Sequence, residues 1–493
     1  MISQADARLI SRAISLQAAV SFIPQRTDQG ENAPEQHETD DAMTDMTGTL
    51  GRLRGPRRRL SMPLLAKGGG ALSLAGPLLL ALPVLLAAIL GFATYAAHGQ
   101  DAAIGIAIGA AGFVAMALAL ILAARPRALE PLFGGLDRMY RAHKWLGITA
   151  LATMVLHDMI DPDFDHAVRE TSLGDTAKDI GEFAFNAFLL LIAVSLLRRL
   201  PFVPIEIPYQ LWRFSHRFMG VLFAIVAFHQ FFVDMPAGAN PGLAVLLNSF
   251  AVAGLAAWIV TEFIAPRLRR RAFTVERIGR HGDTAMVTLL PKGRAMRWRP
   301  GQFAFLSAPE AGLGEPHPFT IANAPEPDGR MTLAIRGLGG WTRRLPHALR
   351  EGMTVRVEGP HGRFDFRKGG ARQLWLAGGV GITPFLAWAD SLGAEDPHHI
   401  HLVYSIRRPE DAIGLEILRA AAARNPRFSF ELVATTRDGR LTAGRLVRSA
   451  PFPPGTADLW FCGPAGLRRT VLGGLDRVGQ NPRRVRFEHF DFA

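Results

Sequence analysis

The sequence predicts a multidomain fold: a six-helix α transmembrane bundle, then an antiparallel β-barrel, then an α/β nucleotide-binding domain. Six apolar stretches of helical length lie between residues 72 and 264, and each approaches the roughly 20 residues needed to cross a bilayer. From Ala272 onwards, short alternating strands are separated by Gly and Pro turns, which is typical of a small barrel. After Arg372 the pattern becomes strand, glycine-rich turn, helix and strand, which predicts an open α/β sheet.

The composition favours a membrane protein over a nucleic-acid-binding one. Of 493 residues, 49% are hydrophobic, and the formal net charge is +12. The arginines cluster at the ends of apolar stretches, so membrane topology explains the charge and no nucleic-acid partner is expected. The single cysteine, Cys462, excludes an internal disulfide framework and cysteine-based metal sites. Membrane lipid is the expected surrounding, and no obligate protein partner is evident.

The expected order along the chain begins with an N-terminal cytoplasmic extension, residues 1–71, which is polar and then basic and is expected to be disordered. The six helices are expected over 72–96, 102–124, 144–160, 181–198, 214–233 and 242–264. Basic residues gather in the loops after the second, fourth and sixth helices, whereas the opposite loops are acidic. The positive-inside rule therefore predicts a multi-pass protein of the cytoplasmic (inner) membrane with both termini in the cytoplasm.

Two of the predicted helices carry two histidines each, His143 with His157 and His216 with His229. At about 1.5 Å rise per residue, spacings of 14 and 13 residues separate each pair by roughly 20 Å, most of the hydrocarbon thickness. The loop charges place His143 and His216 at the inner face and the other two at the outer face. Two imidazoles across a gap supply both axial ligands of a haem iron, so two b-type haems are predicted. For any single histidine, an interhelical hydrogen bond or a proton relay is the alternative.

The 13-residue spacing predicts an irregular helix. At about 100° per residue, 14 residues return to nearly the same helix face, whereas 13 miss it by roughly 140°. The helix with His216 and His229 is therefore expected to bend or wind irregularly near Gly220.

The expected barrel carries two segments suited to a flavin. In HPFT at 317–320, a proline-fixed backbone with an aromatic ring and a hydroxyl can line a flavin ring and hydrogen-bond it. Further on, an arginine precedes a glycine-rich turn whose N–H groups suit a pyrophosphate, although an ordinary barrel corner is the alternative. The candidate FAD-binding residues are His317, Pro318, Phe319, Thr320, Arg336, Gly340, Trp341 and Thr342.

The α/β region carries the expected nucleotide contacts. The turn AGGVGITP at 377–384 follows an apolar strand and opens a helix, so phosphates can approach the helix N-terminus. Two arginines after the next strand modestly favour NADPH over NADH. A later strand ends in Cys462, near where a nicotinamide would reach, although a buried small hydrophobe is the commoner role of cysteine. The candidate NAD(P)H-binding residues are Gly378, Gly379, Gly381, Thr383, Pro384, Ser405, Arg407, Arg408, Cys462, Gly463 and Pro464.

The paired histidines, HPFT, GGVGITPF, CGP and a closing aromatic segment together resemble the NADPH oxidase and ferric reductase superfamily, from about residue 72 to the end. The family shares the 14 and 13 spacings. The resemblance implies a ferric-reductase-like transmembrane domain (72–266), an FAD-binding β-barrel domain (267–371) and a ferredoxin-reductase-like NAD(P)H-binding domain (372–493). It also implies that a C-terminal aromatic, here Phe490 after Glu488, stacks near the flavin. Cys462 and Phe490 are thus the expected catalytic residues.

The expected function is transmembrane electron transfer from cytoplasmic NAD(P)H, through FAD and two b-type haems, to ferric iron or molecular oxygen outside. Superoxide-producing oxidases of this family have a second histidine four residues after the outer one, where this chain has Asp161 in an acidic loop. Ferric reduction is therefore favoured slightly over a dedicated superoxide-producing NADPH oxidase. A membrane anchor or proton channel with a vestigial reductase domain is the remote alternative, and the intact motifs argue against it.

Overall fold

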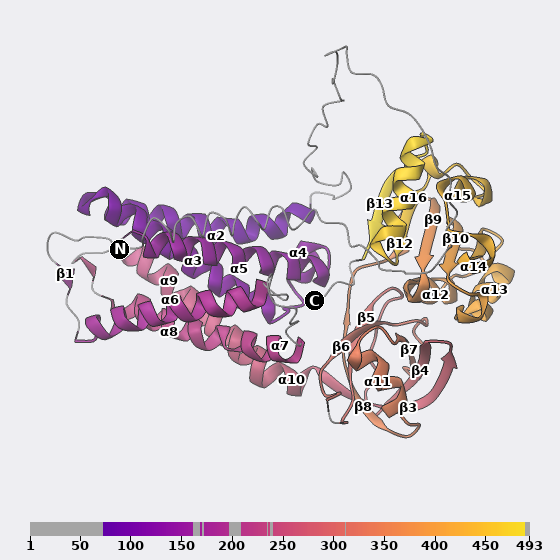
Figure 1. Ribbon diagram of the computed structural model, residues 1–493, viewed down its shortest axis with the longest axis horizontal. Coiled ribbons are helices and arrows are strands. Elements are labelled where there is room, and N and C mark those ends of the chain that lie inside the picture. The colour runs from indigo at the N-terminus through magenta and orange to yellow at the C-terminus, as the bar shows by residue number, and fades with distance from the viewer. Residues whose placement is uncertain are drawn as a thin grey trace, which may run out of the picture. The chain divides into compact units, whose positions relative to one another are not determined.

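The computed structural model describes residues 72–160, 168–169, 172–196, 209–233, 235–236, 240–310 and 312–488 (Figure 1). The expectations for the extension 1–71, for Asp161 and for Phe490 lie outside the described residues.

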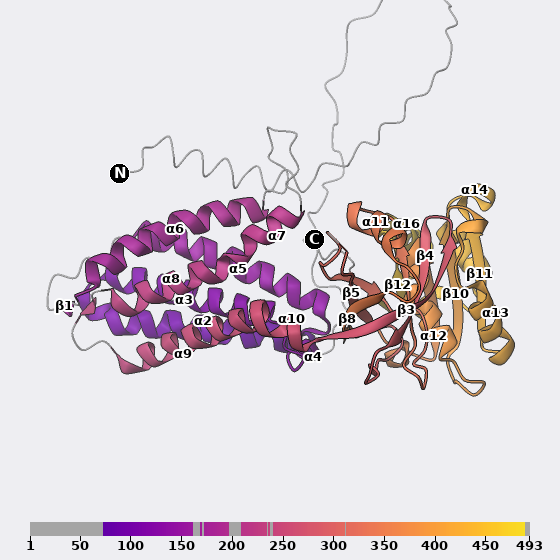
Figure 2. The same ribbon diagram turned by 90° about the horizontal axis from the view of Figure 1, so that it is seen from below.

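Helices occupy all six of the ranges predicted for the membrane domain. In chain order they are α2 (Leu72–Tyr95), α3 (Gln100–Ala123), α5 (Leu136–Asp158), α6 (Gly174–Leu196), the consecutive α7 (Tyr209–Arg217) and α8 (Met219–Phe232), and α9 (Pro241–Ile259). The short α4 (Glu130–Phe133) precedes α5, and α10 (Ala265–Leu268) follows α9 after one π-helical turn. Figures 1 and 2 show α6 running beside α8.

Four segments of the described chain, where six were predicted, are long and apolar enough to cross a membrane. They are Ala75–His98, Gln100–Ala123, Leu211–Phe232 and Pro241–Leu268. The helices α5 and α6 fall short because each is charged over its first half, and ionic side chains are costly in hydrocarbon. The charged residues there are Asp137, Arg138, Arg141 and Lys144 in α5, and Asp175, Lys178, Asp179 and Glu182 in α6.

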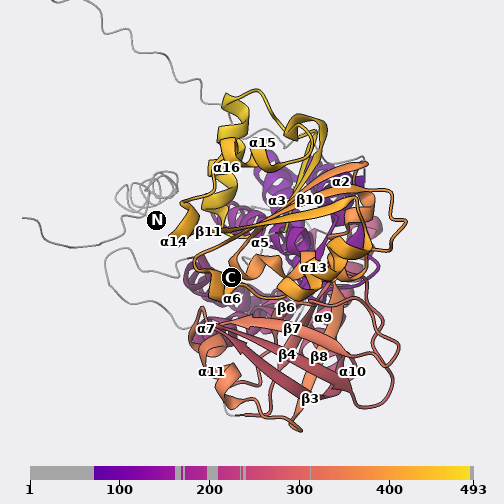
Figure 3. The same cartoon turned by 90° about the vertical axis from the view of Figure 1, so that its right-hand side faces the viewer.

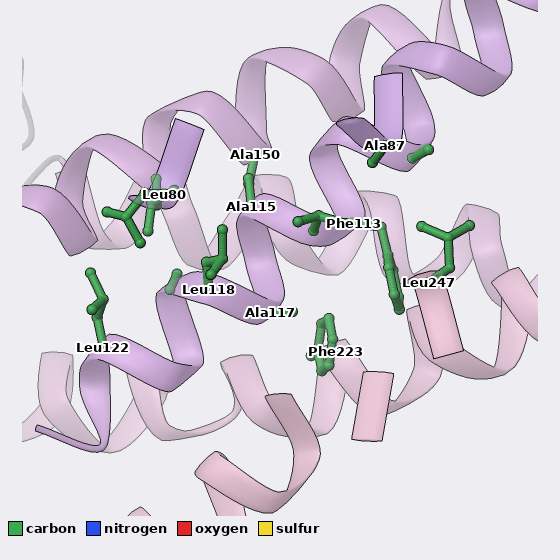
Figure 4. Packing of buried hydrophobic residues seen from close by; sticks show 14 of the residues in the cluster. Leu80, Ala87, Phe113, Ala115, Ala117, Leu118, Leu122, Ala150, Phe223 and Leu247 are labelled. Atoms are coloured by element: carbon green, nitrogen blue, oxygen red, sulfur yellow. The ribbon is translucent and has the colours of Figure 1, made fainter. Parts of the chain in front are cut away.

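The helix α3 is the packing centre of the membrane domain. It contacts α2, α5 and α9, and its buried face is rich in Ala and Gly, which lets neighbouring backbones approach closely. Figure 4 shows its side chains Phe113, Leu118 and Leu122 among the residues of this core. The Phe113 ring stacks on Phe223 of α8, with 5.2 Å between ring centroids.

The predicted irregularity in the second histidine-bearing helix is confirmed. The helix is interrupted at Phe218, between α7 and α8, two residues before Gly220. Gly220 itself allows a close approach to α9, because a Cβ there would collide with the indole ring of Trp258. His216 and His229 therefore lie on opposite sides of a one-residue irregular turn, at which Phe218 keeps helical dihedral angles, φ −70° and ψ −12°.

The flavin-domain sheet has six antiparallel strands in the order β6-β5-β8-β3-β4-β7. The strands are β3 (Arg270–His281), β4 (Thr284–Pro291), β5 (Phe303–Ser307), β6 (His317–Thr320), β7 (Met331–Arg336) and β8 (Thr354–His361). The predicted antiparallel β-barrel is found only as a half-barrel, because the two edge strands meet through one isolated bridge, Ile321 to Leu333. The edge strand β6 is four residues long and contains Pro318, which has no N–H to extend a ladder.

The nucleotide domain is the predicted open α/β sheet. Its parallel strands, in the order β11-β10-β9-β12-β13, are β9 (Arg372–Gly378), β10 (His399–Ile406), β11 (Phe428–Ala434), β12 (Asp458–Cys462) and β13 (Arg484–Phe487). The helices α12 (Thr383–Asp390) and α13 (Leu415–Arg424) share one core, and α15 (Ala443–Ser449) and α16 (Ala465–Arg477) share another. Figure 3 shows α13 and the pair α15 and α16 on opposite sides of the sheet. The strand order reverses between β9 and β12, where such sheets bind ligands at their carboxyl edge.

Replacing Gly220 by Ala tests the close approach of α8 to α9. The added methyl group must displace the Trp258 ring, and overpacking of this kind costs about 1–3 kcal/mol. We expect a lower thermal unfolding midpoint in detergent, measured by circular dichroism. Gly147→Ala in α5 is the matched control, because a Cβ there meets no atom within 4 Å. Equal midpoints for the two variants would contradict the assigned contact.

Candidate functional site

The inner histidines face one another between two helices. The ring centroids of His143 on α5 and His216 on α7 lie 6.0 Å apart. A metal ion bound at about 2 Å from one nitrogen of each ring would separate the ring centres by roughly 6 Å. The indole of Trp212, one turn earlier on α7, stacks on His216 with 5.2 Å between centroids and limits how that ring can turn. This spacing suits an axial pair on one iron.

The outer histidines are held in the same manner from two different helices. The Nδ1 of His157 lies 2.8 Å from the backbone oxygen of Gly105 on α3, and the Nδ1 of His229 lies 2.8 Å from that of Ala177 on α6. The two imidazoles are close enough to interact electrostatically. The pairing of His157 and His229 on one metal stays a prediction.

The hydrogen bonds at Nδ1 fix the tautomer of all four imidazoles. A backbone carbonyl only accepts, so the Nδ1 atoms of His143, His157 and His229 must carry hydrogen; for His143 the acceptor is Ala119 at 2.9 Å. His216 lies 3.2 Å from the hydroxyl of Ser195, which donates its own hydrogen to the backbone oxygen of Leu191 and therefore accepts from His216. Each neutral ring keeps its Nε2 lone pair for a metal, the usual arrangement of metal-bound histidine.

Two glycines that the sequence reasoning missed make room for the outer rings. Gly109 and Gly181 each lie four residues after the residue whose carbonyl accepts from a histidine. A Cβ at Gly109 would lie 2.9 Å from the His157 ring, and one at Gly181 would lie 2.5 Å from Nδ1 of His229. In both cases a glycine stands one helical turn after the residue whose carbonyl accepts from the histidine. The sequence alone does not show which residues accept, so it does not single out these glycines.

The flavin motif HPFT forms β6, and its aromatic groups stack. His317 stacks on Trp341, the second residue of α11 (Gly340–Ala348), with 3.9 Å between centroids, and Phe319 lies 6.0 Å from the same indole. Among the described residues, the buried hydroxyl of Thr320 has no hydrogen-bond partner. An unpartnered buried hydroxyl beside aromatic rings fits a bound flavin, whose ring edge offers polar atoms.

The segments predicted to bind phosphate in the flavin domain and in the nucleotide domain lie side by side. A Cβ at Gly379, which has φ +57°, would lie 3.1 Å from the guanidinium of Arg336 at the end of β7. No carboxylate of the described chain pairs with Arg336, so its charge is available to a phosphate. The hydroxyl of Thr342 instead accepts from the backbone N–H groups of Leu338 and Gly339, at 3.0 and 2.9 Å. The hydroxyl of Thr342 therefore stabilises the turn and is not free for the predicted contact with FAD.

The glycine-rich turn after β9 meets the end of β12, as the sequence predicts. A Cβ at Gly381 would collide with the backbone oxygen of Cys462, and one at Gly378 would lie 2.8 Å from the ring of Pro464. A Cβ at Gly463, which has φ +152°, would lie 2.9 Å from the backbone of Gly378. Thr383 closes the turn by donating to the backbone oxygen of Val380 at 3.1 Å. These close approaches require glycine, and they lie where the strand order reverses, the place at which such sheets bind ligands.

The residues after β10 divide into one engaged and one available arginine. Arg408 pairs with Asp411 at 3.1 Å and with Glu410 at 3.6 Å. The exposed side chain of Arg407 has no partner within the described chain, and Ser405 is buried. Arg407 is therefore the better candidate for an adenosine 2′-phosphate.

Near Cys462 the structure gathers groups that retain their protons. The thiol is fully buried, and burial raises its pKa well above the ordinary value. Burial also raises the pKa of Glu488 well above its ordinary value, and the carboxyls of Asp137 and Glu130 raise it further. Glu488 reaches the turn at Gly362, just after β8. Both groups favour the neutral form, so this position offers hydrogen-bond donors and not a thiolate.

A chain of contacts connects the flavin motif with the inner histidine pair. Arg213 of α7, three residues before His216, donates to Glu315 at 2.6 Å. The second carboxylate oxygen of Glu315 lies 3.7 Å from Nε2 of His317. The flavin sheet is thereby fastened to the helix turn that carries an inner imidazole.

Comparisons with known proteins cover the same three regions. The family model for a ferric reductase like transmembrane component matches residues 108–227, that for an FAD-binding domain matches 268–365, and that for an oxidoreductase NAD-binding domain matches 375–472.

Individual relatives match parts of the chain. It is 28% identical over 198 residues to the toluate 1,2-dioxygenase electron transfer component of Pseudomonas putida, covering 39% of this chain and 58% of that protein. It is 29% identical over 165 residues to the mitochondrial ferric reduction oxidase 8 of Arabidopsis thaliana, covering 30% and 22%. A solved cytochrome P450 reductase from Amycolatopsis has 24% identity and a TM-score of 0.40, covering 45% of this chain and 70% of that one. The chain spans less than two thirds of the length of these curated relatives.

The substitution Gly181→Ala tests how the outer histidine pair is held. Its methyl group would displace the His229 imidazole and break the hydrogen bond to Ala177. We expect the purified variant to keep about half of the haem bound by the native protein, measured from its absorption spectrum, because only one of two pairs is disturbed. Gly147→Ala, in open space, should keep the full amount. Full haem content in both variants would show that Gly181 does not position His229.

Proposed function

We propose that this chain, which belongs to the ferric reductase and NADPH oxidase superfamily, carries electrons from NAD(P)H across a membrane to an acceptor on the far side. It is an NAD(P)H-dependent oxidoreductase with an FAD-binding and a nucleotide-binding domain joined to a ferric-reductase-like membrane domain. One observation carries the transmembrane part of the proposal. Two pairs of imidazoles, each with Nδ1–H donated to its own helix partner, leave four Nε2 atoms for metal.

The proposed arrangement follows the charges of the loops. We assign residues 1–71 to a cytoplasmic extension, 72–266 to the membrane domain, 267–371 to the FAD domain and 372–493 to the NAD(P)H domain, with both termini in the cytoplasm. The helices α5 and α6 lie in the membrane beside the four apolar spans, since α5 packs along α3 and α6 along α8. The proposed membrane is the cytoplasmic membrane, and the positive-inside rule gives the orientation of the chain in it.

The proposed cofactors are FAD and two b-type haems. When bound, FAD would supply the conversion of a two-electron donor into single electrons, and haem would supply one-electron chemistry. His143 and His216 hold the inner haem, and His157 and His229 hold the outer one. Because two histidines would hold each iron, the acceptor would be reduced without binding to the metal.

The other proposed site residues bind and orient the nucleotides. The HPFT strand and Trp341 line the flavin, and Arg336 with the turn at Gly340 binds its pyrophosphate. Phe490 is a further proposed residue of this site and lies outside the described residues. The turn from Gly378 to Pro384 receives the phosphates of NAD(P)H, while Cys462, Gly463 and Pro464 border the nicotinamide. Glu488 holds a proton beside this position.

Ferric iron is the proposed acceptor, and purified protein supplied with NADPH tests it. We expect reduction of a ferric chelate that persists without oxygen and is insensitive to superoxide dismutase. Dismutase-sensitive reduction of cytochrome c would instead identify an oxygen-reducing enzyme and overturn this choice of acceptor. Absence of reducible b-type haem bands would overturn the transmembrane route itself.

Replacing His157 by Leu separates the two halves of the route. The variant loses one axial ligand of the outer pair, so we expect loss of the outer haem and of acceptor reduction together. Reduction of the flavin by NADPH, followed by its absorbance, should remain at the native rate because the nucleotide domains are untouched. Native acceptor reduction by the variant would show that electrons leave from another place.

Replacing Arg407 by Ala tests the preference for NADPH. Removal of the unpartnered guanidinium should raise KM for NADPH by about tenfold, the effect of one lost charged contact, and leave KM for NADH unchanged. Arg408→Ala is the matched control, since Asp411 and Glu410 already neutralise that arginine. A larger effect at Arg408 would reverse the assignment.

A further inference from the structure

A group of arginines surrounds a cavity where the membrane domain meets the flavin sheet. The cavity, about 330 Å³, is lined by Arg127, Leu268, Arg269, Arg271 and Gly359. Its size is at the lower end of the range of ligand pockets, about 300–1,000 Å³. The lining comes from the segment after α3, the end of α10, the start of β3 and strand β8. No candidate site residue of the electron route lines it.

Each of the three lining arginines is held in place by backbone. Arg127 donates to the carbonyl of Gly359 at 2.7 Å, and Arg269 donates to that of Ala124 at 2.7 Å. Arg271 donates to the carbonyl of Ala295 at 2.9 Å. These bonds use part of each guanidinium and leave N–H groups for a ligand, because each guanidinium has five donors in a rigid fork.

The carboxylates near this cavity form no direct ion pair with its lining arginines in the described chain, although Glu130 acts on Arg127 and Glu358 on Arg269 over a longer distance. Glu358 is already paired with Arg125 at 3.1 Å and with Arg270 at 4.0 Å, and none of the three lining arginines forms an ion pair there. The positive charge of this group of arginines acts on a neighbouring histidine. Burial and then the charges of Arg125, Arg127 and Arg269 lower the pKa of His361 to about 3, so this imidazole stays neutral.

We propose that the cavity binds a phosphate group, supplied by the headgroup of an anionic membrane phospholipid. Phosphate oxygens accept from several guanidinium groups at once and neutralise their mutual repulsion. Leu268, 78% exposed, ends the last apolar span and lies at the cavity, so a lipid acyl chain can continue along the helix while its phosphate is among the arginines. Basic pockets at the ends of membrane helices bind anionic headgroups in this way.

The bound phosphate would join the membrane helices to the flavin sheet, since the arginines come from both. The inference does not depend on the haems or on the electron acceptor. It requires a membrane-associated chain and the four elements that line the cavity.

Binding of short-chain phosphatidylglycerol to the purified full chain in detergent tests the proposal, with the thermal unfolding midpoint as the readout. We expect saturable stabilisation by phosphatidylglycerol and none by phosphatidylcholine. The triple variant R127Q/R269Q/R271Q should bind at least tenfold more weakly. Arg267→Gln is the matched control, because this arginine lies on α10 but does not line the cavity. Equal affinities of the triple variant and the control would overturn the site.

A second arm distinguishes the source of the phosphate. Inorganic phosphate at the same concentrations should stabilise the protein far less than the lipid, since it lacks the acyl chain at Leu268. Equal stabilisation by inorganic phosphate would overturn the lipid and identify a soluble ligand. If the triple variant loses its flavin absorbance, the single variant R271Q decides, because Arg271 is exposed and contacts only loop carbonyls. Unchanged lipid affinity in R271Q would then overturn the site.

Discussion

The membrane site depends on one interaction, the donation of an imidazole N–H to a neighbouring helix. Three backbone carbonyls and one hydroxyl accept these hydrogens, and none of the four can donate a hydrogen to the ring. The direction of every Nε2 lone pair follows from that choice. The helices α3 and α6, which carry no proposed ligand, therefore decide where the metal-binding atoms lie. The central position of α3 in the packing serves this purpose, because two of the accepting carbonyls belong to it.

The flavin and nucleotide domains obey a different constraint, the close approach of backbones. Gly378, Gly381 and Gly463 allow two strand ends to touch, and any side chain there would fill the crevice between them. Arg336 reaches the same place from the flavin sheet, so positive charge and open backbone meet at one edge. The two nucleotides are thus expected to share a single crevice, with Cys462 and Glu488 as neutral groups beside it.

The sequence predicted the two histidine pairs, the irregular turn near Gly220 and the strands and helices around each glycine-rich turn. All three follow from residue spacing or from the local order of residues along the chain. The sequence did not predict the hydrogen-bond acceptors or the roles of Gly109 and Gly181, since these require knowing which helices are neighbours. The predicted barrel is only half formed. Its edge strand β6 is short and contains Pro318, which has no N–H to donate, and this local property can be read from the sequence. Two of the six predicted spans, α5 and α6, are not apolar enough to cross a membrane by themselves. Their charged residues were expected in loops but lie within the helices. The role of Phe490 stays a prediction.

The charged first halves of α5 and α6 have a consequence for assembly. A helix with four ionic side chains in its first half gains little by entering a bilayer alone, so these two must rely on apolar neighbours to be held there. For α5 that neighbour is α3, and for α6 it is α8. The ligand-bearing helix α5 is then one of the last parts of the bundle to become stable. Metal binding between α5 and α7 would act as a late fastening step, so a chain made without its cofactor should be the form most easily degraded.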